Sequence, residues 1–568
     1  MTIARPGSRL GPYLSGFHRR WLTEQPEQRW QAVEGSLVFA DVSGFTPLAE
    51  RLAQRGKVGA EELTDILNDL FSELLDVAGR HGGDCLKFGG DALLLLFLGP
   101  GHPRRAVAAA EAMQATLRAL RKEQGRLGGA KLDISMGVHS GTVHAFLAGR
   151  SHRELVVAGP AVTRVLELEA AAQGGEVRVS EATTAALAEP DRQVDDSGVD
   201  DLDEIGDPDG APSAGIPEAL RAFLDGSRRE GEHRLATVGF LKFAGLDDLL
   251  AASGPDAVAV VLDELVAEVQ RACTQMGATF VATDVDVGGG KIILAAGVPS
   301  ASDDDDDHLL LATRSILETT AASPLALRAG AHRGRIFAVD LGSAFRRTYT
   351  VMGDAVNLAA RVMGKAGTGQ LVATQEVLDR RRSEFELDRL EPFTVKGKAQ
   401  PIAAQVVGRA IGRRAERDGG STPLVGRRDE AAAIVAACAS ARSGSGRIVE
   451  LVGEPGIGKS RLLAHAVEAA EGLVHLRFEA GRYSLATPYF ALRRGLREAM
   501  GLSLDAPSDQ VEAALREVVA TSAPELAPWI SLLGVPLGLE LPDSPRTAKL
   551  DADRRRATLQ EAGVSLMG

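Results

Sequence analysis

One pattern occurs twice in this chain, and this repeat constrains the fold more than any other feature of the sequence. The motif Gly-Val-His-Ser-Gly at residues 137–141 returns as Gly-Ala-His-Arg-Gly at 330–334. Likewise, Gly-Pro-Ala-Val at 159–162 returns as Gly-Asp-Ala-Val at 353–356. Motifs that return in the same order indicate tandem copies of a single fold.

Each copy is expected to be an α+β domain with a largely antiparallel sheet. Apolar residues at i, i+3, i+4 and i+7 predict a helix with one buried face at 61–78. Two glycines at 89–90 predict the tight turn of a hairpin. The elements of the first copy are predicted as a strand, a helix, a hairpin, a helix, two strands and a helix, at 36–40, 61–78, 85–97, 104–121, 132–138, 155–157 and 161–172.

Polar segments separate the predicted domains. The predicted parts are a helical lead at 1–34, the first copy at 35–189, a linker at 190–232, the second copy at 233–410, a linker at 411–422 and a third domain at 423–568. The first linker is rich in Asp, Gly and Pro and is expected to lie on the surface. The aspartate run at 303–307 is expected to be a solvated loop that adds negative charge before a helix, not a metal site.

Composition excludes several classes of function. The formal net charge of −13 and a pI of about 5.5 argue against binding of nucleic acid or anionic membranes through bulk charge. The three cysteines, Cys85, Cys273 and Cys438, are too far apart in sequence to suggest a zinc motif or a disulfide framework. No apolar run reaches the ~18 residues of a membrane span. These features predict a cytoplasmic protein.

Two aspartates are candidates for metal binding. Asp41 ends the strand at 36–40, and Asp91 follows the glycine turn of the hairpin. Hard divalent cations prefer carboxylate oxygens. Asp41 alone would be interpreted as a turn residue, but together with Asp91 it predicts a metal site, with the backbone carbonyl of Val42 as a further ligand.

These motifs resemble those of class III nucleotidyl cyclases. Residues 41–46 and 87–91 are similar to the two metal-binding motifs of that family, and 357–361 is similar to its transition-state motif. Tandem copies before a P-loop domain resemble most closely the bicarbonate-responsive soluble adenylyl cyclases. The resemblance implies a ferredoxin-like cyclase fold, two copies packed as a pseudo-dimer, and two Mg²⁺ or Mn²⁺ ions at the site.

The resemblance also assigns roles to residues of the second copy. Asn357 would orient the ribose, and Arg361 would stabilise charge on the α-phosphate in the transition state. These two residues are four apart and share a helix face. Either Lys396 or Lys398 would contact the phosphates, and an ordinary surface lysine remains an equal alternative for both.

The two copies have diverged in opposite ways. The first copy has Thr163 and Glu167 at the positions of Asn357 and Arg361, and the second has Lys242 at the position of Asp41. One composite site between the copies is therefore expected. The other, degenerate site is a possible place for a small-molecule regulator.

The residues with which the family recognises the base and an anion are only partly present in this sequence. The adenine-recognising lysine of the family aligns with Val281 or Ala282, which cannot donate, and its aspartate partner aligns with Thr350, where the soluble adenylyl cyclases also have threonine. Neither position has the Glu or Cys expected for guanine, so ATP is favoured over GTP. Lys291 is interpreted as a surface lysine and not as a substitute. The anion-binding lysine of the family matches Lys87, but Leu166 occupies the arginine position, which argues against a bicarbonate response.

The third domain has a nucleotide-binding motif. Residues 453–460 fit G-x-x-x-x-G-K-S between a predicted buried strand at 447–452 and a predicted helix at 461–470. The residues expected to bind ATP and Mg²⁺ are Gly453, Gly458, Lys459 and Ser460. The domain resembles AAA-like signalling ATPases of the STAND type. No apolar strand with terminal acids follows, so an incomplete α/β domain without turnover, from a longer protein, is expected.

The sequence thus predicts an enzyme that converts ATP to cyclic AMP and pyrophosphate, coupled to an ATP-binding domain. The alternative is a catalytically weak cyclase-homology module that regulates a STAND-type signalling ATPase. Neither a nucleic-acid partner nor a membrane span is expected.

Overall fold

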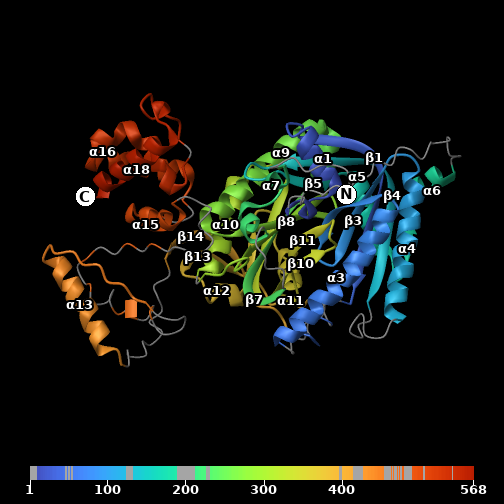
Figure 1. Ribbon diagram of the computed structural model, residues 1–568, viewed down its shortest axis with the longest axis horizontal. Helices are drawn as coiled ribbons and strands as arrows, with labels where there is room; N and C mark the ends of the chain where they lie inside the picture. Colours follow the sequence, from blue (N-terminus) through green and yellow to red (C-terminus); the bar gives the residue numbers. More distant parts are fainter. Residues whose placement is uncertain are drawn as a thin grey trace, which may run out of the picture. The chain divides into compact units, whose positions relative to one another are not determined.

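The computed structural model describes most of the chain and divides it into two compact units (Figure 1). The described residues are 9–44, 48, 51–52, 56–122, 132–188, 211–224, 231–302, 304–395, 400–413, 426–452, 459, 462–463, 465, 470, 473, 476, 478, 489–502, 506–539 and 541–567. The first unit centres on Met1–Arg381 and Phe385–Ile411, and the second on Gly412–Gly481 and Pro488–Gly568. None of the described helices is long and apolar enough to cross a bilayer.

Each half of the first unit is built on one sheet, as the repeat predicts. The first sheet has the order β2-β3-β1-β4-β5, with β6 paired to β4, and the second has the order β13-β14-β12-β10-β7-β9-β8, with β11 paired to β10. The pairings are antiparallel except β4–β6 and β10–β12. The prediction of an α+β fold is therefore confirmed.

The strands and helices of the first unit have the following bounds. The strands are β1 (Trp30–Ser43), β2 (Gly83–Gly89), β3 (Ala92–Leu98), β4 (Asp133–Ala148), β5 (Glu154–Ala158), β6 (Val177–Val179), β7 (Glu232–Ala244), β8 (Thr279–Asp286), β9 (Gly289–Ala296), β10 (Ala326–Gly342), β11 (Arg347–Met352), β12 (Leu371–Thr374), β13 (Ser383–Arg389) and β14 (Ala404–Arg413). The helices are α1 (Gly16–Glu24), α3 (Gly56–Arg80), α4 (His102–Lys122), α5 (Pro160–Ala171), α6 (Glu181–Ala188), α7 (Ala211–Ala214), α8 (Glu218–Leu224), α9 (Leu246–Met276), α10 (Asp305–Thr319), α11 (Asp354–Met363) and α12 (Gln375–Leu378).

The run of apolar residues in β3 is buried on both faces. Leu93, Leu95 and Phe97 belong to the cluster under α3 and α4. Leu94 and Leu96 face the opposite way, into a cluster shared with the second half. A strand covered on both faces has no polar side, which explains the unbroken apolar sequence.

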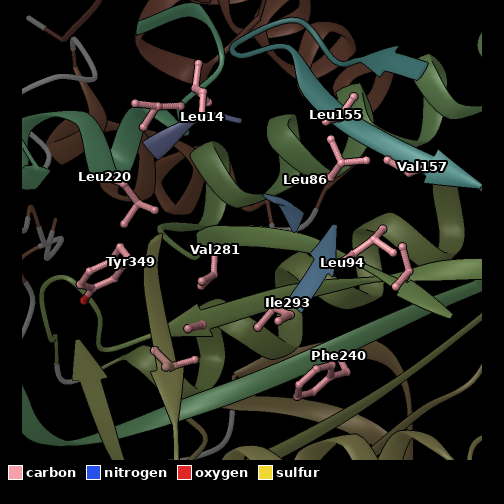
Figure 2. Close-up of a cluster of buried hydrophobic side chains, with 14 of the residues drawn as sticks. Leu14, Leu86, Leu94, Leu155, Val157, Leu220, Phe240, Val281, Ile293 and Tyr349 are labelled. Carbon is pink, nitrogen blue, oxygen red and sulfur yellow. The ribbon is translucent and has the colours of Figure 1, made fainter. Parts of the chain in front are cut away.

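The shared cluster joins the two halves of the first unit. Figure 2 shows Leu86 and Leu94 of the first half beside Val281, Ile293 and Phe240 of the second. The helices also pack across the boundary reciprocally, because α3 contacts β10 of the second half while α9 contacts β4 of the first. This packing holds the strand ends of one half against those of the other.

The first linker is not wholly a surface segment, and this part of the prediction is wrong. Residues 211–224 include α7 and α8, and Ile216, Leu220 and Leu224 are buried in the shared cluster. Figure 2 shows Leu220 in this cluster. Their spacing of four residues gives α8 one apolar face. The polar composition of the surrounding linker obscured this short amphipathic helix.

The aspartate run was also predicted incorrectly as a solvated loop. Asp304 to Asp307 are each 5% exposed or less, and Asp303 lies outside the described residues. Asp306 Oδ2 lies 2.9 Å from Arg333 Nη1 and 3.5 Å from Arg380 Nε. Both arginines are distant in the sequence, so the ion network that permits this burial could not be inferred from the run itself.

The second unit is helical where it is described. Its helices are α13 (Arg428–Arg442), α15 (Phe490–Ala499), α16 (Ser508–Ser522), α17 (Ile530–Gly534) and α18 (Ala552–Met567). The buried strand predicted at 447–452 is wrong, because this segment has no strand conformation and Ile448 is fully exposed. A strand of that kind is buried only between neighbouring strands, and none of the described residues after 413 forms one.

Candidate active site

The structure brings Asp41 and Asp91 together at one end of the first sheet. Asp41 is opposite Ala92 in the β1–β3 register, and the backbone N–H of Val42 donates to the carbonyl of Asp91 at 3.1 Å. Gly90 has a φ of +73°, which glycine adopts without strain, so the hairpin turns tightly before Asp91. The two carboxylates predicted from the motifs are therefore neighbours.

The surroundings of Asp41 and Asp91 disfavour two ionised carboxylates without a counter-ion. Burial, together with the charges of Asp91, Glu169 and Asp284, raises the pKa of Asp41 to about 7. Burial also raises the pKa of Asp91 to about 6, with Asp284 and Glu169 adding to the effect. A cation placed between the two aspartates would relieve this repulsion.

The two carboxylates fit a hard divalent ion whose remaining coordination positions are filled by the substrate. Among the described residues, no group of three or more His, Cys, Asp or Glu side chains is arranged to hold a metal ion. Mg²⁺ commonly takes one or two carboxylates and fills its other positions with water and phosphate oxygens. Asp41 and Asp91 match that requirement, and they do not form a closed protein cage.

A cavity of about 160 Å³ lies between the two halves and receives residues from both. The first half contributes Gly89, Gly90 and Asp91, and the second contributes Thr350 from β11 and Asn357 from α11. Arg361, predicted to act with Asn357, lies in the last turn of α11 and does not line this cavity. Lys396 and Lys398 lie outside the described residues.

Two charged residues of this cavity were not predicted as part of a site. Lys291 on β9 lines the cavity, and its Nζ lies 3.2 Å from Asp284 Oδ2 on β8. The interpretation of Lys291 as a surface lysine is therefore wrong. A Cβ on Gly89 would lie 3.0 Å from Asp284 Oδ1, so glycine allows this carboxylate to approach the hairpin. Lys291 is two residues before the buried Ile293 and therefore shares its face of β9, and this spacing was the signal that it faces the other half.

At the second, degenerate site between the halves, the polar residues pair with other residues of the chain. Thr163 Oγ1 donates to Asp247 Oδ2 of the second half at 2.6 Å. Lys242 Nζ lies 3.0 Å from Asp286 Oδ1, and Glu167 Oε2 lies 3.1 Å from Arg164 Nη1. These residues satisfy one another where the first site has two aspartates and an asparagine.

Lys87 also has partners within the protein. Its Nζ donates to Glu154 Oε1 and to Thr283 Oγ1, each at 2.7 Å. Burial alone would raise the pKa of Glu154, but the charges and hydrogen bonds of Lys87 and His152 together outweigh it and hold this pKa well below its usual range. Leu166, at the position expected for an anion-binding arginine, is buried in the shared apolar cluster. An internal carboxylate thus neutralises the lysine.

The nucleotide motif of the second unit is described only at Lys459. That residue has helical conformation, whereas Gly453, Gly458 and Ser460 lie outside the described residues.

Two family models match the chain. The model described as the adenylate and guanylate cyclase catalytic domain matches residues 27–205 and again 229–408. The model described as the AAA ATPase domain matches residues 423–566. The two matches of the first model coincide with the two sheets of the first unit.

Individual relatives match shorter stretches. The human "Adenylate cyclase type 10" is 30% identical over 151 residues, which are 26% of this chain and 9% of the relative. An "Adenylate cyclase" of Mycobacterium tuberculosis is 26% identical over 182 residues, which are 31% of this chain and 40% of the relative. The matches thus span less than half the length of either relative. Among solved structures, a "Class III adenylyl cyclase-like ATP-binding protein from Pseudomonas aeruginosa" has a TM-score of 0.47 and 13% identity, covering 67% of this chain and 94% of that one.

Proposed function

Because this chain belongs to the adenylate and guanylate cyclase family and carries an AAA-type ATPase domain, we propose that it converts ATP to 3′,5′-cyclic AMP and pyrophosphate. The reaction takes place at one composite site where the two catalytic-domain copies pack as a pseudo-dimer. The observation that carries this proposal is the cavity that Asp91 of the first copy shares with Thr350 and Asn357 of the second.

Asp41 and Asp91, with the carbonyl of Val42, would hold two Mg²⁺ or Mn²⁺ ions. When bound, such ions supply a more acidic ribose 3′-hydroxyl and neutralise charge on the triphosphate. The aspartates fix the ions at the hairpin, and the Val42–Asp91 backbone hydrogen bond keeps the two ligand strands in register. Burial of the site strengthens each of these electrostatic contacts.

Residues of the second copy would act on the nucleotide. Asn357 lines the cavity and orients the ribose, while Arg361 follows it by one helical turn and meets charge that develops on the α-phosphate. The first copy has Thr163 and Glu167 at these positions, so a single productive site results. Lys396 or Lys398 would add a phosphate contact.

The preference for ATP rests on the cavity and on the relatives. Thr350 offers one hydroxyl, which donates and accepts, and neither base-recognising position has the Glu or Cys expected for guanine. The relatives with matching segments are adenylate cyclases by name. Lys459 and its loop would bind a second ATP with Mg²⁺ in the AAA-type domain.

The decisive measurement is cyclic product from the purified full chain with Mn²⁺ and either ATP or GTP. Cyclic AMP formed from ATP is expected to exceed cyclic GMP formed from GTP, and Asp41→Ala and Arg361→Ala are expected to lower the rate at least about a hundredfold. Glu167→Ala is the matched control, because Glu167 holds the position of Arg361 in the first copy. Absence of product with both nucleotides contradicts the proposal, as does full activity of Arg361→Ala.

A second candidate function is regulation without turnover. The absence of a base-binding lysine at Ala282 favours it, since binding of a nucleotide without specific base contacts would suffice to control the attached ATPase domain. This candidate predicts that ATP binds to the first unit while no cyclic product forms, and that ATP hydrolysis by the second unit changes when Asp41 is replaced.

A further inference from the structure

The only basic side chain among the described residues that line the composite cavity is Lys291. It lies at the start of β9, opposite Asp284 on β8 and Lys242 on β7. The side chain is 25% exposed, and its ammonium lies 3.2 Å from Asp284 Oδ2. Lys291 therefore brings a positive charge from the second half into the cavity that Asp91 of the first half lines, next to its neighbour Asp41.

The adjacent lysine provides a comparison on the same sheet face. Lys242 is the cross-strand neighbour of Lys291, and its ammonium lies 3.0 Å from Asp286. Asp286 lies at the end of β8, beside the β8–β9 turn, whereas Asp284 reaches the Gly89 hairpin of the other half. Only Lys291 of this pair lines the cavity.

The charge of Lys291 acts on Asp41 of the aspartate pair. Burial alone would lower the pKa of Lys291, but the charges of Asp284, Asp286 and Asp41 outweigh it and the pKa is raised. The ammonium is therefore charged at neutral pH. In the opposite direction, Lys291 lowers the pKa of Asp41, against the larger effects of burial and Asp91.

We infer that Lys291 is a tethered cation that competes with divalent metal ions for the site of Asp41 and Asp91. A metal ion entering this site meets a fixed positive charge that already stabilises the carboxylates, so the nucleotide-free chain binds metal weakly. The inference deepens the proposed function, since it concerns the same site, but it does not depend on turnover. It makes Lys291 a positioning residue that couples metal binding to arrival of the triphosphate, whose oxygens offer the ammonium other partners.

The test measures Mn²⁺ binding to the nucleotide-free full chain. The electron paramagnetic resonance signal of free Mn²⁺ reports how much of the ion is bound. Lys291→Met is expected to lower the Kd of the site roughly tenfold, because a repelling unit charge is removed. Lys291→Arg, which keeps the charge, is expected to match the wild type. Lys242→Met is the control for loss of a lysine on the same face and is expected to leave the Kd unchanged. Asp91→Asn in each background identifies which bound Mn²⁺ belongs to this site.

An unchanged or higher Kd in Lys291→Met overturns the inference, and so does an equal decrease in Lys242→Met, which would show only a general effect of surface charge. Circular dichroism checks that each variant is folded, and Lys291→Gln replaces Lys291→Met if the latter is not. The two hypotheses fail separately. Cyclic AMP formation with an unchanged Mn²⁺ Kd rejects this inference alone, while tighter Mn²⁺ binding without cyclic product rejects the proposed enzyme alone.

Discussion

Glu154 is a buried carboxylate that joins the two halves of the first unit. Its carboxylate is buried and accepts from Lys87 Nζ at 2.7 Å and from Thr283 Oγ1 at 2.6 Å. Thr283 belongs to the second half, so one carboxylate of the first half ties the two together. The composite cavity differs, because its ion pair, Lys291 with Asp284, lies within the second half, and Asp91 of the first half lines the same cavity.

Loss of Glu154 is predicted to destabilise the first unit strongly. Glu154→Ala leaves the Lys87 ammonium buried without its counter-charge, which costs about 3–5 kcal/mol. Because the pKa of Glu154 is depressed in the folded chain, its contribution is fully present above the unfolded value of 4.5 and is lost only as the pH falls toward the folded value. Urea unfolding at pH 7 measures the effect.

A double variant separates a buried charge from a general defect. Lys87→Met combined with Glu154→Leu removes both charges and keeps the volume, so it is expected to recover most of the lost free energy of unfolding. Equal destabilisation of the single and double variants would argue against the ion pair as the cause.

Two elements position the composite site: the β2–β3 hairpin and α11. The hairpin was predicted at 85–97 and is found as β2 and β3, because its glycine turn and apolar strand are local signals. Helix α11 follows Gly353, whose φ of +118° turns the chain from β11 into the helix. Both elements depend on the shared apolar cluster for their relative position, and α8 is part of that cluster.

Helix α8 is predicted to contribute to stability although it lies in a linker. Leu220 is 3% exposed, so Leu220→Ala should lower the free energy of unfolding by about 2–4 kcal/mol. Glu218→Gln at the start of the same helix is the control and should cost less than about 1 kcal/mol. Chemical denaturation of the full chain, with a probe in the first unit, gives both values. A neutral Leu220→Ala would mean that α8 does not hold the halves together in solution.

Local patterns predicted most of these elements, whereas features set by distant partners were not predicted. The Asp41–Asp91 neighbourhood followed from strand ends and a turn, all within about fifty residues of sequence. The burial of Asp306 depends on Arg333, and the orientation of Lys291 depends on strand pairing with Asp284. The predicted strand at 447–452 failed for the same reason, because an apolar run specifies a strand only when neighbouring strands cover it.

At the scale of the whole molecule, the first unit has two similar halves with unequal sites. The contacts across the boundary are reciprocal in the packing of α3 on β10 and α9 on β4. The chemistry is not reciprocal, since Lys242 and Thr163 occupy the positions of Asp41 and Asn357. Linking both halves in one chain allows this asymmetry, because each half always meets a partner of the complementary kind.

This arrangement predicts that two differently inactivated chains cannot rescue each other. Asp41→Ala damages the first half and Arg361→Ala damages the second, so a mixture contains intact halves of both kinds, but on separate chains. If the composite site forms within one chain, the cyclase activity of the mixture should equal the sum of the two separate variants. Exchange of halves between chains, as in domain swapping, would instead restore a substantial fraction of wild-type activity.

The measurement is cyclic AMP formation after co-incubation and after co-expression, with a wild-type chain diluted into each variant as the reference for full recovery. Rescue in either mixture would place the two halves of the site on different chains and would contradict the intramolecular pseudo-dimer.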